Sequence, residues 1–223
     1  MISLREVSVI KNKTPILSDI SLEIAEKRVG IIGRNGSGKS TLAKLFNGLE
    51  IPTSGLVTLV DSVNQVIPLN KNVGFVFQNP DNQIVFPIVE EDLAFGLKSS
   101  GKGKKEIVEC IDYYLNKFDL NALKSRYTHQ LSGGEKQLIA LIGVLVMGPK
   151  YIVLDEPTTL LDLANRILLI RVLRNLEQNL IIVSHDLDFV SELDRVILIE
   201  DGEVIRDSIP SVVLPYYRET SIC

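Results

Sequence analysis

Residues 29–41 read Val-Gly-Ile-Ile-Gly-Arg-Asn-Gly-Ser-Gly-Lys-Ser-Thr, and this stretch decides the fold class. Its first four residues form a short apolar segment typical of a buried strand. Residues 33–40 then match the pattern G-x-x-x-x-G-K-[ST], and a helix is predicted over residues 41–48. A strand, a glycine-rich loop and a helix in this order predict the phosphate-binding loop of an α/β protein.

The chemistry of this loop follows from its residue types. Glycines let backbone N–H groups approach phosphate oxygens, and the N-terminus of the following helix favours negative charge. Lys39 is expected to reach the β- and γ-phosphates of a nucleotide, and the Ser40 hydroxyl is expected to bind Mg²⁺. The predicted nucleotide-binding residues are Gly33, Arg34, Asn35, Gly36, Ser37, Gly38, Lys39, Ser40 and Thr41.

Two acidic residues follow a second apolar segment, residues 151–154. A buried strand there would place Asp155 beside the phosphate loop, where its carboxylate can hold Mg²⁺ through water. Glu156 comes next, so its side chain should point the other way and can polarise an attacking water. An acidic pair at a strand end is common by itself, and only the phosphate loop gives this pair a catalytic interpretation.

His185 follows another apolar segment, residues 180–184, and is one of two histidines in the chain. A lone histidine is usually structural. This one ends a strand of the same predicted sheet, at the edge where α/β folds bind nucleotides. We interpret His185 as a hydrogen-bond donor that senses a γ-phosphate, and His129 as incidental.

A second anion-binding pattern precedes an apolar helix predicted over residues 136–147. Ser132 and the backbone of two glycines at a helix N-terminus can form a phosphate site. One nucleotide cannot use both sites of one chain if they lie far apart. The simplest solution is a head-to-tail pair that holds ATP between the loop of one copy and this signature of the other. The signature residues are Leu131, Ser132, Gly133, Gly134 and Glu135.

Length and composition narrow the function classes. The 223 residues are 45% hydrophobic with a net charge of −4, which indicates one domain with a sizeable core and no basic excess for nucleic acid. Cys110 and Cys223 lack metal-ligand spacing. The longest apolar stretch, residues 138–147, is shorter than the roughly 20 residues of a membrane span. Alternating predicted strands and helices favour a mostly parallel sheet, preceded by a strand pair at residues 4–10 and 17–24.

Together these motifs resemble the ATP-binding subunits of ATP-binding-cassette (ABC) transporters over nearly the whole chain. The resemblance implies a single ABC ATPase domain over residues 1–223. It implies a P-loop core with a mostly parallel sheet, an N-terminal antiparallel β subdomain and a small helical signature subdomain at about residues 79–148. Glu156 would be the catalytic base and His185 the switch histidine. Gln78 would touch Mg²⁺ and relay to a membrane partner, and Asp162 would communicate across the dimer.

One position departs from the family. An aromatic residue that stacks on adenine usually lies near residues 10–11, and this chain has Ile10 and Lys11. Apolar contact from Ile10 or from the stem of Lys11 is the possible substitute, so the resemblance implies little about base selectivity.

The segment after Gln78, residues 79–98, resembles the extra helix of energy-coupling-factor (ECF) ATPases, which serve importers of vitamins and metal ions. Gly143, where many ABC importers have arginine, also resembles that group. The ATPases of biotin importers are the most similar, and those of cobalt or nickel importers are the alternative, because another subunit selects the substrate. An apolar cluster in this segment is interpreted as a docking surface for a transmembrane partner, with closure of the core as the alternative. It consists of Ile84, Val85, Phe86 and Ile88, followed by acidic Glu90, Glu91 and Asp92.

The predicted function is Mg²⁺-dependent ATP hydrolysis at the cytoplasmic face of the membrane. The expected partners are a transmembrane coupling protein and a substrate-binding membrane protein, without nucleic acid. The working pair is either two copies of this chain or this chain with a related one. A soluble ABC ATPase acting on DNA or ribosomes is the alternative, although such proteins usually carry a coiled-coil insertion or two cassettes. A P-loop kinase or GTPase would lack the signature and His185.

Overall fold

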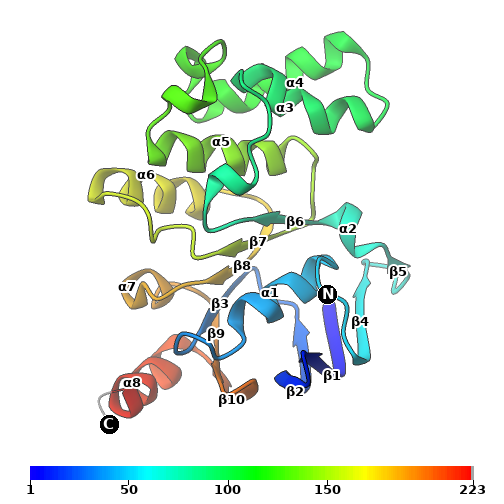
Figure 1. Cartoon of the computed structure of the whole chain (residues 1–223), viewed down its shortest axis with the longest axis vertical. Coiled ribbons are helices and arrows are strands. Elements are labelled where there is room, and N and C mark those ends of the chain that lie inside the picture. Colours follow the sequence, from blue (N-terminus) through cyan, green and yellow to red (C-terminus); the bar gives the residue numbers. More distant parts are fainter. Residues whose placement is uncertain (222–223) are drawn as a thin grey trace. The chain divides into compact units, whose positions relative to one another are not determined.

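The computed structural model describes residues 1–221, which divide into two compact units (Figure 1). The first unit contains Met1–Phe75, Lys150–Glu156 and the described part of Gln178–Cys223. The second unit contains Val76–Pro149 and Pro157–Glu177. The predicted helical subdomain at about residues 79–148 stays a prediction; the second unit includes that range and adds residues 157–177.

A six-stranded, mostly parallel sheet forms the centre of the first unit, in the order β10-β9-β3-β8-β7-β6. Strand β3 runs parallel to β8 and β9, β7 runs parallel to β8, and β10 is antiparallel to β9. The middle strands are continuous apolar runs, as expected for strands buried on both faces. The carboxyl ends of β3, β7 and β8 therefore meet at one edge of the sheet. The strands are β3 (Arg28–Ile32), β6 (Val73–Val76), β7 (Tyr151–Asp155), β8 (Asn179–Val183), β9 (Arg195–Glu200) and β10 (Glu203–Ser208).

An antiparallel sheet in the order β2-β1-β4-β5 completes the strands of the first unit. The predicted strand pair is present: Ile2 lies opposite Ile24, and the turn between them uses left-handed backbone at Asn12 and Lys13. Strand β5 has only two residues, too few for a periodic pattern in the sequence. The strands are β1 (Ile2–Lys11), β2 (Thr14–Ile24), β4 (Ser54–Val60) and β5 (Val66–Ile67).

Three short or interrupted helices of the first unit, α2, α7 and α8, were not predicted from the sequence. Helix α1 starts directly after the glycine loop, packs against β7 and β8, and ends at Gly48, whose N–H donates to the Leu45 carbonyl. Helix α8 was missed because Pro215 lies inside it, yet Val213 and Leu214 of α8 are buried. The helices are α1 (Lys39–Asn47), α2 (Leu69–Asn72), α7 (Leu187–Val190) and α8 (Pro210–Ser221).

The second unit is helical around its own apolar core, in which α3, α4 and α5 contribute most side chains. The sequence predicts helices over residues 136–147 and 160–176, and the starts of both move for the same physical reason. Helix α5 starts at residue 133 and α6 at residue 163, because Ser132 and Asp162 cap them as N-cap residues. The helices are η1 (Pro80–Asn82), α3 (Val89–Ser99), α4 (Lys104–Lys117), η2 (Asn121–Leu123), η3 (Thr128–Gln130), α5 (Gly133–Leu145) and α6 (Leu163–Arg174).

Within residues 1–221, no helix combines the length and the apolar character that crossing a bilayer requires. Cys110 is a free, partly buried thiol that packs beside the core of the second unit. Cys223, the other cysteine considered from the sequence, lies outside the described residues.

Candidate nucleotide site and signature

The phosphate loop between β3 and α1 adopts a backbone that requires glycine at two positions. Gly33 and Gly38 have φ values of 149° and 101°. A Cβ atom on Gly33 would lie 2.0 Å from the Ile199 carbonyl oxygen, and one on Gly38 would lie 2.8 Å from the Ile16 carbonyl oxygen. The loop can therefore pass close to its neighbours, where a side chain at either position would clash.

Lys39 is buried inside the curve of the loop. Its ammonium group donates hydrogen bonds to the carbonyl oxygens of Gly33 and Arg34, both at 2.8 Å. Burial lowers the pKa of Lys39, while the carboxylates of Glu156 and Asp155 raise it in part. The loop thus encloses a cation whose counter-charges lie at the end of β7.

Arg34 ties the loop to helix α8. Its guanidinium Nη2 donates to the Thr220 carbonyl oxygen at 2.7 Å, in the last turn of α8. Arg34 and Thr220 also line a pocket together with Asn35, Gly36, Ser37, Glu200 and Asp201.

Ser40 and Asp155 come together from α1 and the end of β7. The Ser40 hydroxyl donates to Asp155 Oδ1 at 3.1 Å. Burial raises the pKa of Asp155, and the hydrogen bond from Ser40 and the charges of Lys44 and Lys39 oppose this effect. A hydroxyl and a carboxylate are hard oxygen ligands of the kind that Mg²⁺ uses beside nucleotide phosphates, so this pair fits the cation.

Glu156 and His185 meet at the same sheet edge. Glu156 is 7% exposed, and its N–H donates to the Val183 carbonyl at 3.0 Å. His185 Nε2 lies 3.1 Å from Glu156 Oε1, and the His185 N–H donates to Oε2 at 3.3 Å. Glu156 lies beyond the last residue of β7 with a left-handed φ of 49°, so this backbone turn, rather than strand alternation, directs its side chain.

The signature residues form the start of α5 in the second unit. Ser132 and Glu135 make a reciprocal capping box: the Glu135 N–H donates to Ser132 Oγ at 3.2 Å, and the Ser132 N–H donates to Glu135 Oε2 at 2.7 Å. Arg126 lies 3.5 Å from the other Glu135 oxygen. The signature is therefore a helix N-terminus whose N-cap hydroxyl keeps its own hydrogen available for a further acceptor.

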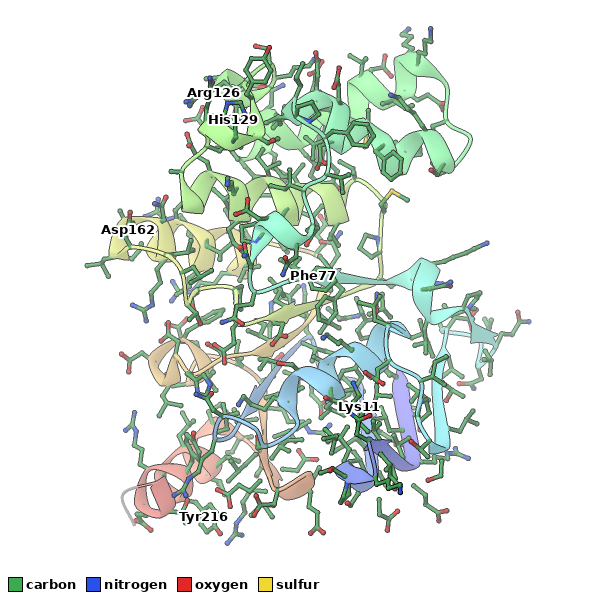
Figure 2. The ribbon with its side chains drawn as sticks, viewed as in Figure 1. Lys11, Phe77, Arg126, His129, Asp162 and Tyr216 are labelled. Carbon is green, nitrogen blue, oxygen red and sulfur yellow. The ribbon has the colours of Figure 1, made fainter. Side chains whose placement is uncertain are left out.

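Asp162 lies at the N-terminal end of α6 (Figure 2). Its carboxylate accepts hydrogen bonds from the backbone and the side-chain amide of Asn165, at 2.8 and 3.0 Å. A Cβ atom on Gly134 would lie 2.3 Å from the Asn165 carbonyl oxygen Oδ1, so the start of α5 packs directly on this amide. Asp162 and the signature are consequently neighbours within the second unit.

Part of the apolar cluster after Gln78 is exposed, as a docking surface requires, and part packs against the core, as the alternative interpretation requires. Val85 is 75% exposed, and Phe86 contacts the ring of Phe95, with the centroids 5.1 Å apart, while Phe95 is itself 54% exposed. Ile84, in contrast, packs against the core of the second unit. Asp92 Oδ1 accepts hydrogen bonds from the N–H groups of Val85 and Phe86. Asp92 therefore holds the loop in place.

Sequence reasoning missed Gln83, which connects the end of β6 to α5. Its Nε2 donates to the Ala140 carbonyl at 2.7 Å, and its Oε1 accepts from the N–H of Phe77 at 3.3 Å. Gln137 Nε2 also donates a hydrogen bond to the Phe77 carbonyl oxygen at 3.4 Å. A glutamine in a polar loop carries no periodic signal, so only its contacts reveal this role.

The structure places the predicted residues in two groups. Lys39, Ser40, Asp155, Glu156 and His185 come together in the first unit, whereas Gln78, the signature and Asp162 belong to the second. Residues 10 and 11 lie in β1: Ile10 is 52% exposed, and Lys11 forms an ion pair with Glu50.

A glycine loop around a buried lysine, beside a serine–aspartate pair at the carboxyl edge of a parallel sheet, defines a P-loop nucleotide-hydrolysing fold. The family profile described as "ABC transporter" matches residues 17–159. The chain belongs to this family and is an ABC ATPase, which confirms the predicted fold class and enzyme class.

Several bacterial relatives agree with this assignment. The chain is 49% identical to a putative ABC transporter ATP-binding protein of Deinococcus radiodurans, over 98% of each chain. It is 43% identical to the biotin transport ATP-binding protein BioM of Rhizobium etli, over 91% of each. It is 42% identical to the energy-coupling factor transporter ATP-binding protein EcfA1 of Caldanaerobacter subterraneus, over 89% of this chain and 75% of that relative. The predicted resemblance to ECF-type ATP-binding subunits is thereby confirmed.

Solved structures show the same fold. The structure of cbiO1 from Clostridium perfringens, described as part of the ABC transporter complex cbiONQ, has a TM-score of 0.83 at 34% identity and covers 99% of this chain and 94% of that one. A dimeric post-hydrolysis structure of the ATP-binding cassette MJ0796, bound to ADP and phosphate, has a TM-score of 0.78 at 27% identity. It covers 94% of this chain and 99% of that one.

Proposed function

We propose that this chain is the energy-coupling ATPase subunit of an ECF-type importer, held at the cytoplasmic face of the membrane by its partners. The observation that supports this proposal most directly is the cluster at the edge of the six-stranded sheet. There Ser40 donates to Asp155, and Glu156 lies 3.1 Å from His185.

Each residue of the cluster has a role in this proposal. Lys39 and the loop N–H groups would bind the phosphates of ATP, and Ser40 and Asp155 would hold Mg²⁺. Mg²⁺ bound there would neutralise charge on the phosphate oxygens. Glu156 accepts a proton from the attacking water, and His185 orients Glu156 and contacts the γ-phosphate.

The signature supplies the other side of the nucleotide site, from the second subunit of the pair. Ser132 and the N–H groups of Gly133 and Gly134 bind the phosphates of ATP held on the loop of another subunit, so two subunits enclose two nucleotides. Asp162, which reaches the start of α5 through Asn165, relays between the two sites. Closing and reopening of this pair would drive the membrane partner.

The direct test is Glu156→Gln in the purified chain. We expect the rate of ATP hydrolysis to fall by about 10²–10³-fold or more, because the proton acceptor is lost, while ATP binding persists and dimers accumulate. Light scattering and phosphate release would measure the two effects. The exposed carboxylate of Glu203 provides the matched control, Glu203→Gln, which should hydrolyse ATP normally. Normal turnover by Glu156→Gln would contradict the role of Glu156.

For the transported compound we propose biotin. The support is the 43% identity to a biotin transport ATP-binding protein along nearly the full length of both chains. The exposed side chains of Val85 and Phe95 are the proposed contact for the transmembrane partner, since a partner helix can bury them. The alternative compound is a cobalt or nickel ion.

Purification of the tagged chain from detergent-extracted membranes of its host tests the partner and the compound together. We expect a multi-spanning scaffold and a second membrane protein that binds biotin, and Val85→Glu/Phe95→Glu should release both. Recovery of a membrane protein that binds Co²⁺ or Ni²⁺ would reassign the compound. Recovery of ribosomal or DNA-repair proteins alone would favour a non-transport ABC ATPase.

A further inference from the structure

The phosphate loop is held at two points by the C-terminal part of the first unit. The N–H of Gly202, in the turn between β9 and β10, donates to the Ser37 carbonyl oxygen at 3.1 Å. The Arg34 guanidinium donates to the Thr220 carbonyl oxygen of α8 at 2.7 Å. Lys39 anchors the backbone of the same arginine, because its ammonium group donates to the Arg34 carbonyl oxygen at 2.8 Å. Arg34 therefore links the lysine of the loop to α8.

Helix α8 is itself fixed to the six-stranded sheet. It packs against β9 and β10, and its Val213 side chain is fully buried. The guanidinium of Arg206 in β10 lies 4.4 Å from the centroid of the Tyr216 ring in α8 (Figure 2). The Thr220 carbonyl belongs to the last turn of α8, where carbonyl groups lack partners within the helix and carry partial negative charge. A guanidinium is a favourable partner for this helix end, so Arg34 and α8 stabilise each other.

The tip of the loop, which follows Arg34, is exposed. Asn35 and Gly36 lie in solvent, and a Cβ atom on Gly36 would meet no described atom within 4 Å. A glycine backbone loses more conformational freedom than that of any other residue when it is ordered. A contact that keeps the loop ordered before a ligand arrives reduces the entropic cost of binding. The hydrogen bond from Arg34 to α8 can make this contribution, because it fixes the residue directly before the tip.

We propose that Arg34 is a positioning residue for nucleotide binding that acts through α8. Its guanidinium, held by the Thr220 carbonyl oxygen, keeps the loop in the backbone conformation that binds phosphate, and it adds affinity without contacting the nucleotide. The sequence predicts Arg34 as a nucleotide-binding residue; in this proposal its backbone keeps that role and its side chain serves α8. The inference rests on nucleotide binding at the loop, as in the proposed function, and on neither the paired subunits nor the transported compound. Because such a coupling is reciprocal, bound nucleotide must stabilise the docked α8 by the same factor.

The first test is the affinity of the full chain for Mg²⁺-ADP, which requires neither hydrolysis nor a second subunit. Arg34→Met should raise the dissociation constant about three- to tenfold, the range expected for one exposed hydrogen bond. Arg34→Lys should restore part of the affinity, because an ammonium group can still donate to the carbonyl. Isothermal titration calorimetry would measure the constants. Arg218→Met, at an exposed arginine in the last turn of α8, forms the matched control and should bind ADP unchanged. An unchanged constant for Arg34→Met would overturn the inference.

A second substitution separates an effect through α8 from a direct contact between Arg34 and the phosphates. Val213→Asp places a charge at a fully buried position of α8 and should release this helix from the sheet. In that background Arg34→Met should weaken ADP binding no further, because the two changes remove the same interaction. An equal loss of affinity in both backgrounds would show that the guanidinium contacts the nucleotide, and would contradict the role of α8.

Hydrogen exchange tests the same coupling without any change in α8. Saturating Mg²⁺-ADP should slow the exchange of the amides in the last two turns of α8 in the unaltered chain, by about the factor measured for affinity, and should not do so in Arg34→Met. Mass spectrometry of peptides from residues 210–221 would measure the rates. Equal rates with and without bound ADP in the unaltered chain contradict only this inference. A chain that does not bind Mg²⁺-ADP contradicts the proposed function as well.

Discussion

Asp155 occupies a position that favours its neutral form, although holding Mg²⁺ requires its carboxylate. Burial raises the pKa of Asp155, so the folded chain binds this proton more tightly than the unfolded chain does. The ionised group therefore lowers the stability of the folded state at neutral pH, and this cost disappears as the pH falls through the raised pKa. A charge kept at such a cost is typical of a binding site.

We predict that Asp155→Asn raises the melting temperature of the nucleotide-free chain at pH 8 by a few degrees, on the order of 1 kcal/mol, while abolishing Mg²⁺-dependent hydrolysis. The difference in melting temperature should shrink as the pH is lowered toward the range where Asp155 is protonated. Calorimetry at several pH values between about pH 5 and about pH 8, a range just above the ordinary pKa of a carboxyl group, would measure this difference in melting temperature. The variant Glu203→Gln should show no such trend. Equal or lower stability of Asp155→Asn at pH 8 would refute the argument.

Individual site residues differ in how far the sequence predicted them. The glycine loop was predictable because its residues act together within one short stretch of sequence, from Gly33 to Lys39. The contact of Glu156 with His185 joins residues 29 positions apart through the pairing of β7 and β8, which a sequence pattern does not show. Gln83 was missed for the same reason, since its partners lie in α5 and at Phe77.

Among the helices, the start of α5 shows one residue serving both folding and binding. Ser132 Oγ accepts the Glu135 N–H as an N-cap, and the proposed function has the same hydroxyl donate to a phosphate. These two uses are compatible because a hydroxyl accepts and donates at once. Replacements of Ser132 that retain N-capping but not phosphate binding can separate the two uses.

We predict that Ser132→Ala lowers the stability of the chain by about 1 kcal/mol, whereas Ser132→Asp leaves it nearly unchanged, because aspartate is also a good N-cap. Both replacements should abolish ATP-dependent dimers of the Glu156→Gln chain, since alanine removes the donor and aspartate places a negative charge against the phosphate. Urea unfolding and sedimentation would separate the two properties. ATP-dependent dimerisation of Ser132→Asp would argue against phosphate binding at this site.

The helix boundaries show where sequence patterns are weakest. Apolar periodicity indicated the bodies of α5 and α6 but started α5 three residues late and α6 three residues early, at residues 136 and 160. In both cases the N-cap side chain sets the start of the helix by accepting the N–H of the third residue after it. Apolar periodicity carries no information about this hydrogen bond. Helix α8 has a proline at position 215, which the pattern treats as a helix breaker, although burial of its apolar face compensates.

At the scale of the whole first unit, Arg195 joins the two sheets. Its guanidinium forms a bidentate pair with Asp207 of β10, with both distances at 2.6 Å. It also donates to the Glu23 carbonyl oxygen within β2 at 2.7 Å and to the Glu26 carboxylate, just after β2, at 2.9 Å. The pKa of Arg195 is raised, first by the hydrogen bonds to Asp207. The pKa of Glu26 is lowered, since burial, which raises it, is outweighed by hydrogen bonds that include Arg195. Bidentate pairs of this kind are among the stronger polar contacts in proteins.

We predict that Arg195→Met destabilises the chain by about 1–3 kcal/mol at pH 7, because it leaves Asp207 and Glu26 without their partner. A lowered carboxyl pKa contributes stability above its ordinary pKa and loses it as the pH falls. The difference between the two chains should therefore be smaller at an acid pH of about 4. Urea unfolding at both pH values would test this, with Arg5→Met, an exposed arginine of β1, as the control. An undiminished difference at acid pH would show that packing, rather than charge, is responsible.

The hydrogen bond between Arg34 and the last turn of α8 gives this end of the helix a practical use. A solvatochromic dye attached there, for example at the exposed position of Arg218, would sit next to the phosphate loop without occupying it. Its emission would change as nucleotide enters and leaves, so one labelled subunit could work as an optical sensor of its own turnover in a reconstituted vesicle.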